Sequence, residues 1–249
     1  MSSLKPTINQ IARQFKKNLS HYQQEARVQK GMAEKILALV QDNLPRPQRI
    51  LELGAGSGLL SALLAETFPK SRFFLNELVD TQEEILTTLV PDAEFVPGDM
   101  LGVPWPQQLD LVIANAAIQW VENLPLFFRK AAQSLASGGV LALTSFGPEN
   151  YKEIRNITGR GLPYRSLSEW DQFFEQDFVL LYRQEEIKPL YFPTPLAVFR
   201  HMKATGVNSL GPESSTLWLP PLLLAYEQFL TPQGYPLTYQ PQYLLAQRK

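Results

Sequence analysis

The residues with the clearest chemical use lie between Glu52 and Gly58. Gly54, Gly56 and Gly58 occupy alternate positions there, and the acidic Glu52 precedes them. Glycine allows positive φ and lets a ligand approach the backbone, because it carries no Cβ. Free N–H groups at the start of a following helix would bind the polar end of that ligand. The stretch therefore predicts a small-molecule site built largely from backbone.

Apolar residues on both sides indicate the elements that hold this stretch. Residues 50–53 are typical of the end of a buried strand, and apolar residues recur at helical spacing between Leu59 and Phe68. A dinucleotide fingerprint would need glycine three residues after Gly56, where this chain has Leu59. The spacing therefore argues against a dinucleotide.

An acidic residue at the end of the next predicted strand, residues 72–75, belongs to the same site. Glu77 lies 19 residues after the last glycine of the turn (77 − 58). An acidic side chain about 20 residues past such a turn is the expected acceptor for ribose hydroxyls. A solvated glutamate is the alternative, and Asn76, Asp80 and Glu83 are fallback candidates if the strand ends elsewhere.

Composition limits the classes of function. The chain has 249 residues, a net charge of −1 and a pI near 6.2, so no basic surplus suggests nucleic acid binding. It has no cysteine and two histidines, which argues against disulfides and metal sites. The first residues lack an apolar signal core, and the most apolar later run, 217–226, is too short to span a bilayer. We expect a cytoplasmic protein that binds no metal, membrane or nucleic acid, and we favour a monomer.

The hydrophobic pattern predicts an α/β fold, with a doubly wound, mostly parallel seven-stranded sheet and a helical lid. A single domain would comprise N-terminal helices in 1–45, a cofactor-binding core in 46–147, lid and strand insertions in 148–236, and a closing strand in 237–249. The near-continuous apolar run at 110–115 is typical of a central parallel strand. Helices are predicted at 7–25, 28–40, 123–135, 149–157 (or a loop), 167–174, 195–205 and 217–230. Further strands are predicted at 94–96, 140–145, 178–190 (or a hairpin) and 237–247, where Pro241 implies a bulge or an exposed edge.

The pattern E-x-G-x-G-x-G at 52–58 resembles motif I of the class I S-adenosylmethionine-dependent methyltransferases. The resemblance implies S-adenosylmethionine as cofactor and S-adenosylhomocysteine as product. It places Glu52 near the methionine ammonium and Glu77 at the ribose, with Asp99 at the adenine amine and Met100 or Leu101 over the ring. The full implied cofactor set is Glu52, Gly54, Ala55, Gly56, Gly58, Glu77, Leu78, Asp99, Met100, Asn115 and Ala116.

Longer segments resemble one narrower family. N-x-x-x-Q-W at 115–120, F-R-H-M-K-A-T-G-V-N at 199–208 and G-Y-P-L-T-Y at 234–239 resemble the malonyl-acyl carrier protein O-methyltransferases of the biotin pathway. The opening segment, with Phe15, Tyr22, Ala26, Val28, Gln29 and Met32, is similar too. Two departures are Asn76-Glu77, where the family more often has aspartate, and Pro241.

This family methylates the free carboxylate of a malonyl thioester on acyl carrier protein. A carboxylate is ionised at neutral pH, so we expect no general base. The dehydrated anion needs a fixed cation, and a guanidinium donates two parallel hydrogen bonds to it. Arg165 is the predicted cation, with Lys203 as its rival and a surface arginine as the alternative interpretation. Tyr22, Gln119 and Trp120 are predicted neighbours of the malonyl unit, and Arg155, Arg160, Arg200 and Lys203 are predicted contacts for the acidic carrier protein.

Two other functions remain open at this stage. One is methylation of a free small carboxylic acid or amine, with the lid enclosing the substrate. The other is a non-catalytic cofactor-binding or scaffolding protein, which would bind the cofactor without turning over any carboxylate.

Overall fold

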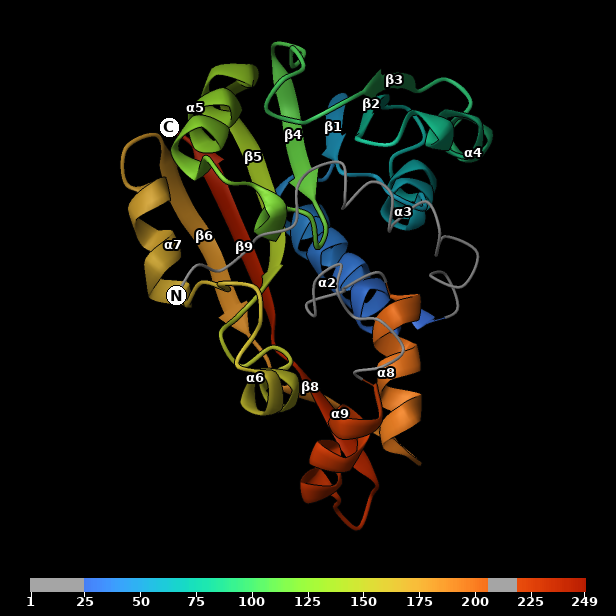
Figure 1. Cartoon of the computed structure of the whole chain (residues 1–249). Coiled ribbons are helices and arrows are strands. Elements are labelled where there is room, and N and C mark those ends of the chain that lie inside the picture. The colour runs from blue at the N-terminus through green and yellow to red at the C-terminus, as the bar shows by residue number, and fades with distance from the viewer. Residues whose placement is uncertain (1–24, 206–218) are drawn as a thin grey trace. The chain divides into compact units, whose positions relative to one another are not determined.

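A computed structural model describes residues 25–205 and 219–249 of the chain, which divides into two compact units (Figure 1). The core unit comprises residues 27–145, 166–185 and 242–249. The insert unit comprises the described residues 25–26, 146–165, 186–205 and 219–241. The helix predicted over 7–25, and Tyr22 within it, lie outside the described residues apart from Glu25.

The core unit is built on a seven-stranded sheet in the order β3-β2-β1-β4-β5-β9-β6. The five strands from β3 to β5 pair in parallel, whereas β6 and β9 pair antiparallel. The mostly parallel seven-stranded sheet is therefore confirmed. The strands are β1 (Arg49–Leu53), β2 (Arg72–Glu77), β3 (Glu94–Pro97), β4 (Leu109–Ala114), β5 (Leu135–Phe146), β6 (Phe178–Glu185) and β9 (Pro241–Arg248).

Helices cover both faces of this sheet because successive strand residues point to opposite faces. Ile50 of β1 belongs to one hydrophobic cluster, and its neighbour Leu51 belongs to the other. Residues of α2, α3 and α4 fill the Ile50 cluster, and residues of α5 and α7 fill the Leu51 cluster. These helices are α2 (Arg27–Asn43), α3 (Leu59–Thr67), α4 (Glu83–Leu89), α5 (Leu124–Ser134) and α7 (Leu167–Phe174), with 3-10 turns η1 (Asp80–Gln82) and η2 (Ile118–Trp120).

The insert unit contains a two-stranded antiparallel sheet with helices packed on it. Strand β7 (Lys188–Phe192) pairs with β8 (Tyr235–Tyr239). Helix α8 (Pro195–Ala204) packs on both strands, and its N-cap Thr194 accepts a hydrogen bond from the Ala197 N–H. Helices α6 (Lys152–Thr158) and α9 (Leu219–Tyr226) pack against each other, and the turn η4 (Glu227–Phe229) follows α9.

Three predicted elements differ from the structure. Residues 178–190 are not one strand or hairpin, because β6 pairs with β9 whereas β7 pairs with β8. The helix that begins after Asn123 ends at Ser134, since Leu135 already pairs with Leu109 as the first residue of β5. The helix predicted from residue 149 begins only at residue 152.

The closing strand was also predicted wrongly, since residues 237–247 form two strands in different sheets. Pro241 is the first residue of β9, where its missing N–H removes no bond from the middle of the ladder. Strand β9 lies between β5 and β6, so it is not an edge strand. Its end lies beside the start of β5, where Gln247 Nε2 donates to the Gly138 carbonyl at 3.0 Å. Strand β9 therefore starts at the edge where β5 ends, the carboxyl edge of the parallel strands.

Candidate active site

The glycine turn joins β1 to α3 at the carboxyl edge of the sheet. Gly54, Gly56 and Gly58 have φ values of 68°, 58° and 78°, which side-chain-bearing residues rarely adopt. A Cβ on Gly54 would lie 2.7 Å from Ala117 Cβ, which is closer than two carbon atoms can approach without a shift of the backbone. The turn therefore needs glycine both for its conformation and for its packing. Ala55, within it, is buried.

Glu77 lies directly against this turn. Its Oε2 accepts a hydrogen bond from the Gly56 N–H at 2.8 Å, and its Oε1 accepts one from the Val79 N–H at 3.1 Å. Burial raises the pKa of Glu77, and the hydrogen bond from Gly56 opposes that rise. The carboxylate thus lies where β2 ends beside the glycine turn, as a ribose acceptor requires. Leu78, the next residue, is half-buried.

The fallback candidates for the ribose lie in other surroundings than Glu77. Asn76 uses its side-chain amide to donate to the carbonyls of Val96 and Gly98, both at 2.9 Å, so it ties β2 to β3. Asp80 and Glu83 are exposed, on η1 and at the start of α4.

Glu52 is buried on the α3 side of the sheet. Its Oε2 accepts a hydrogen bond from Ser61 Oγ of α3 at 2.6 Å. Burial raises the pKa of Glu52 to about 8; Ser61 opposes this rise, and the charge of Glu77 adds to it. Burial therefore favours the neutral carboxyl, and a cation bound beside it would favour the ionised form.

Asp99 and Met100 form the turn after β3. Asp99 Oδ1 accepts from the Leu101 N–H at 3.0 Å, so part of its carboxylate stabilises the turn itself. Met100 reaches the glycine turn, because its Cε lies 3.8 Å from the position that a Cβ on Gly54 would occupy. An apolar side chain is thus present beside the turn, as a cover over an aromatic ring requires.

Asn115 and Ala116 follow β4 and are held by Thr144 of β5. Asn115 Oδ1 accepts from Thr144 Oγ1 at 2.6 Å, and Thr144 Oγ1 accepts from the Ala116 N–H at 2.8 Å. Ala116 has a φ of 51°. Gln119 Nε2 donates to the Ala116 carbonyl at 2.5 Å, whereas the buried Oε1 of Gln119 receives no hydrogen bond from the described residues. An acceptor for a ligand is therefore present here, and Trp120 beside it is half-buried.

These residues fit a nucleoside cofactor with an amino-acid end. The core unit brings Glu77, Met100 and the glycine turn together, which supplies a hydroxyl acceptor, an apolar surface and backbone. Lys130 of α5 reaches the turn after β3, where its Nζ donates to the carbonyls of Leu101 and Val103 at 2.9 Å and 2.7 Å. Within the described residues, no three His, Cys, Asp or Glu side chains are grouped to hold a metal ion.

The residues predicted for the substrate belong to both units. Arg165, in the insert unit, is half-buried and precedes Ser166, the N-cap of α7. Arg155 is half-buried on α6, and Arg160 is exposed after that helix. Arg200 and Lys203 are both exposed on α8.

Sequence reasoning missed a buried polar network in the insert unit. His201 Nε2 lies 2.8 Å from the Tyr239 hydroxyl, and His201 Nδ1 lies 2.8 Å from Glu25 Oε2. The Tyr239 hydroxyl in turn accepts from the Tyr151 hydroxyl at 2.9 Å. The only signal for this network was that F-R-H and Y-P-L-T-Y belong to the two most distinctive segments of the sequence. The structure shows that these segments contact each other.

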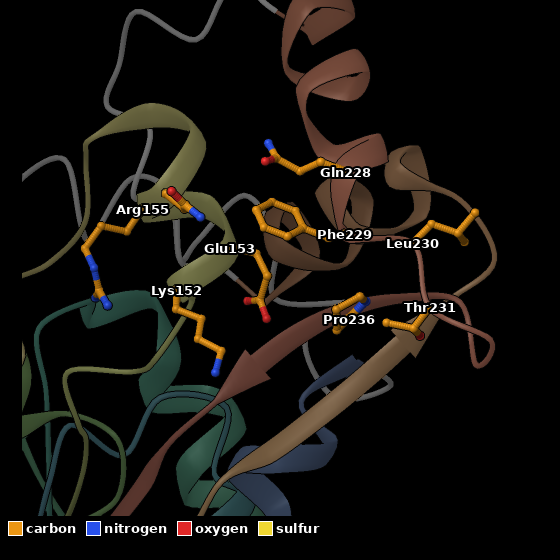
Figure 2. Close-up of a pocket in the computed structure, with 9 residues that line it drawn as sticks. Lys152, Glu153, Arg155, Gln228, Phe229, Leu230, Thr231 and Pro236 are labelled. Carbon is orange, nitrogen blue, oxygen red and sulfur yellow. The ribbon is translucent and has the colours of Figure 1, made fainter.

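A pocket of about 650 Å³ lies in the insert unit between α6 and residues 228–231, which comprise the end of η4 and the residues after it. Figure 2 shows α6 contributing Lys152, Glu153 and Arg155, while Gln228 and Phe229 come from the other side. Lys152 and Arg155 both pair with Glu149, at 3.4 Å and 4.0 Å. The pocket therefore combines an aromatic wall with exposed charges that could exchange partners.

Comparisons with known proteins agree with this geometry. The profile described as "Methyltransferase domain" matches residues 51–143. A protein of Bacteroides thetaiotaomicron named malonyl-acyl-carrier protein O-methyltransferase is 34% identical over 96% of this chain and 97% of its own. The chain belongs to the malonyl-acyl carrier protein O-methyltransferase family. A Haemophilus influenzae protein of that name is also 34% identical, over 96% of this chain and 94% of its own.

Solved structures show the fold of this O-methyltransferase. The chain matches a structure of geranyl diphosphate methyltransferase in complex with S-adenosylmethionine, with a TM-score of 0.56 and 14% identity, over 88% of this chain and 85% of that one. The chain thus has the fold of the class I methyltransferases. No helix in the described ranges is both long and apolar enough to cross a bilayer.

Proposed function

We propose that this protein transfers a methyl group from S-adenosylmethionine to the free carboxylate of a malonyl thioester on acyl carrier protein. The ester would prime pimeloyl synthesis for biotin. The observation that carries the proposal is similarity across 96% of the chain to relatives with this activity in their name. It extends over both units, whereas the profile match falls within the core unit alone. Of the three segments that resemble the family, 115–120 belongs to the core unit, whereas 199–205 and 234–239 belong to the insert unit.

The chemistry requires alignment rather than proton transfer. The bound cofactor supplies an electrophilic methyl group on a sulfonium, and the malonyl carboxylate is ionised at neutral pH. The protein must hold that oxygen in line with the methyl group and exclude water from it. Neither role needs histidine, and His201 is already held between Glu25 and Tyr239.

Arg165 is the proposed partner of the malonyl carboxylate. A guanidinium fixes the direction of both carboxylate oxygens, which a lysine ammonium does not. Tyr22, Gln119 and Trp120 are its proposed neighbours, and Gln119 has a buried oxygen without a partner among the described residues. Lys203 remains the rival cation.

The carrier protein would bind exposed and half-buried basic residues of the insert unit. We include Lys152 with Arg155, Arg160, Arg200 and Lys203, because Lys152 lines the same pocket as Arg155. Acyl carrier proteins are acidic, so such residues would accelerate encounter in a salt-dependent manner. Exchange of Glu149 for a carrier carboxylate would keep both Lys152 and Arg155 paired.

Mass spectrometry of malonyl-acyl carrier protein incubated with S-adenosylmethionine tests the proposal. We expect a mass increase of one methylene, with little increase for malonic acid. Arg165→Ala should remove most of the activity and Arg165→Lys should restore little, while both bind S-adenosylhomocysteine normally. Preferential methylation of malonic acid, or of a small amine, would favour a small-molecule methyltransferase. Cofactor binding without turnover of any carboxylate would favour a non-catalytic protein.

A further inference from the structure

Gln29 is a buried side chain with an acceptor that no described residue uses. It is 3% exposed, and its Oε1 receives no hydrogen bond within the described residues. A buried amide oxygen without a partner destabilises a folded protein, so most such atoms bind a protein group, a water or a ligand. Gln29 is therefore a candidate for contact with a bound molecule.

The backbone of Gln29 is anchored at the carboxyl edge of the sheet. Its carbonyl accepts a hydrogen bond at 3.1 Å from Nδ2 of Asn115, which directly follows β4. Strand β4 is the neighbour of β1, with Ile113 beside Glu52, and β1 leads into the glycine turn. Gln29 thus lies within one strand of that turn, in the first turn of α2, the long blue helix in Figure 1.

The helix also determines which way the Gln29 side chain points. Residues four apart lie on the same face of a helix. Ala33, four residues after Gln29, is fully buried in the cluster that contains Ile50 of β1. Ile50 and Glu52 share one face of the strand, so Gln29 and Glu52 lie on the same side of the sheet.

We propose that the Gln29 amide binds the amino-acid end of S-adenosylmethionine. That end carries an ammonium and a carboxylate, and a primary amide provides both an acceptor and two donors. Oxygen and nitrogen of the amide exchange by a flip, so one side chain serves either charge. Glu77 and Met100 are assigned to the nucleoside, which leaves Gln29 and Glu52 for the amino acid. The inference depends on the cofactor and is independent of the methyl acceptor.

Two ligands separate this role from simple packing. S-adenosylhomocysteine contains the amino acid, whereas 5′-methylthioadenosine has the same nucleoside and sulfur without it. Calorimetry on Gln29→Met, which keeps size and helix propensity, should show about tenfold weaker binding of S-adenosylhomocysteine and unchanged binding of 5′-methylthioadenosine. Gln82→Met is the matched control, since Gln82 is also buried with a partnerless Oε1 but lies on η1. Gln82→Met should leave the ratio of the affinities for S-adenosylhomocysteine and 5′-methylthioadenosine unchanged.

Equal weakening of both ligands in Gln29→Met, or no weakening, would overturn the proposal. If this variant does not fold, NMR spectra of the wild-type protein labelled with ¹⁵N-glutamine test the contact instead. The Gln29 side-chain amide signal should shift with S-adenosylhomocysteine and stay in place with 5′-methylthioadenosine, and any other pattern contradicts the contact. Wild-type protein that binds neither ligand would refute the cofactor assignment itself.

Discussion

The cofactor edge of the core unit and the polar network of the insert unit are assembled in different ways. At the cofactor edge, each functional residue except Gln29 of α2 lies in or just after a strand, and parallel strands bring their carboxyl ends to one edge. In the insert unit, the contact of His201 with Tyr239 joins residues 38 positions apart, and its contact with Glu25 joins residues 176 apart. The core site is therefore set by local turns, whereas the network depends on the packing of distant segments.

The largest difference in stability and in cofactor affinity should appear between alanine variants of two glycines with similar backbone conformations. Gly54 has a φ of 68° and would place a Cβ 2.7 Å from Ala117, whereas Gly159, after α6, has a φ of 64° and nothing within 4 Å. Gly54→Ala should destabilise the protein by about 2–4 kcal/mol, from the left-handed conformation plus overpacking. It should also weaken S-adenosylhomocysteine binding by at least about tenfold, or about 1.4 kcal/mol.

Gly159→Ala is the control, with a cost of about 1 kcal/mol and normal cofactor affinity. Urea unfolding and calorimetry measure both quantities. Equal losses of stability and of cofactor affinity in the two variants would mean that close packing of the glycine turn is unimportant.

The second prediction concerns the pH dependence of stability in the core unit. Because the folded state raises the pKa of Glu52 from 4.5 to about 8, it retains a proton that the unfolded state releases. The free energy of unfolding should therefore fall as pH rises from about 4.5 to about 8. Glu52→Gln removes this contribution, so its stability relative to wild type should increase over that range, by on the order of 4 kcal/mol.

Chemical denaturation at pH 5, 6, 7 and 8 measures this trend. The exposed Glu122→Gln serves as the control and should follow the wild-type curve. A Glu52→Gln variant whose stability parallels wild type at every pH would show that Glu52 is ionised throughout.

The insert unit should respond differently when its network is broken. His201→Phe keeps a ring but leaves the Tyr239 hydroxyl without its imidazole partner, at a cost of about 2 kcal/mol. Cofactor affinity should stay at the wild-type value, because the cofactor residues belong to the core unit. Thermal unfolding and calorimetry test this, with the exposed Arg200→Ala on the same helix as control. Weaker cofactor binding without loss of stability would contradict the separation of the two regions.

The smallest effect on stability is expected at the pocket of the insert unit. Lys152→Ala breaks an exposed ion pair with Glu149 and should change stability by less than about 1 kcal/mol. It should nevertheless raise the KM for malonyl-acyl carrier protein at low salt, with a smaller effect at high salt. Lys188→Ala breaks a similar exposed pair with Glu186 away from the pocket and should leave KM unchanged. If the KM depends on salt in the same way in both variants, Lys152 does not contact the carrier protein.

Features that depend on the spacing of residues along the chain could be predicted from the sequence. Glycine at alternate positions required a turn, and Glu77 at the following strand end could be placed from its distance along the chain. Pairing of segments was harder, because Phe178–Glu185 and Lys188–Phe192 are consecutive yet join different sheets. His201 and Gln29 lie in segments that resemble the family, but no role could be assigned to either from the sequence, since each depends on partners distant in sequence.

The central position of β9 has a consequence for synthesis of the chain. Strand β9 follows every other described strand in sequence, yet it lies between β5 and β6. On the ribosome, β5 and β6 keep an unpaired edge until residues 186–240 have been translated. Unpaired edges can pair with other chains, so interruption of synthesis before residue 241 would leave an aggregation-prone nascent product.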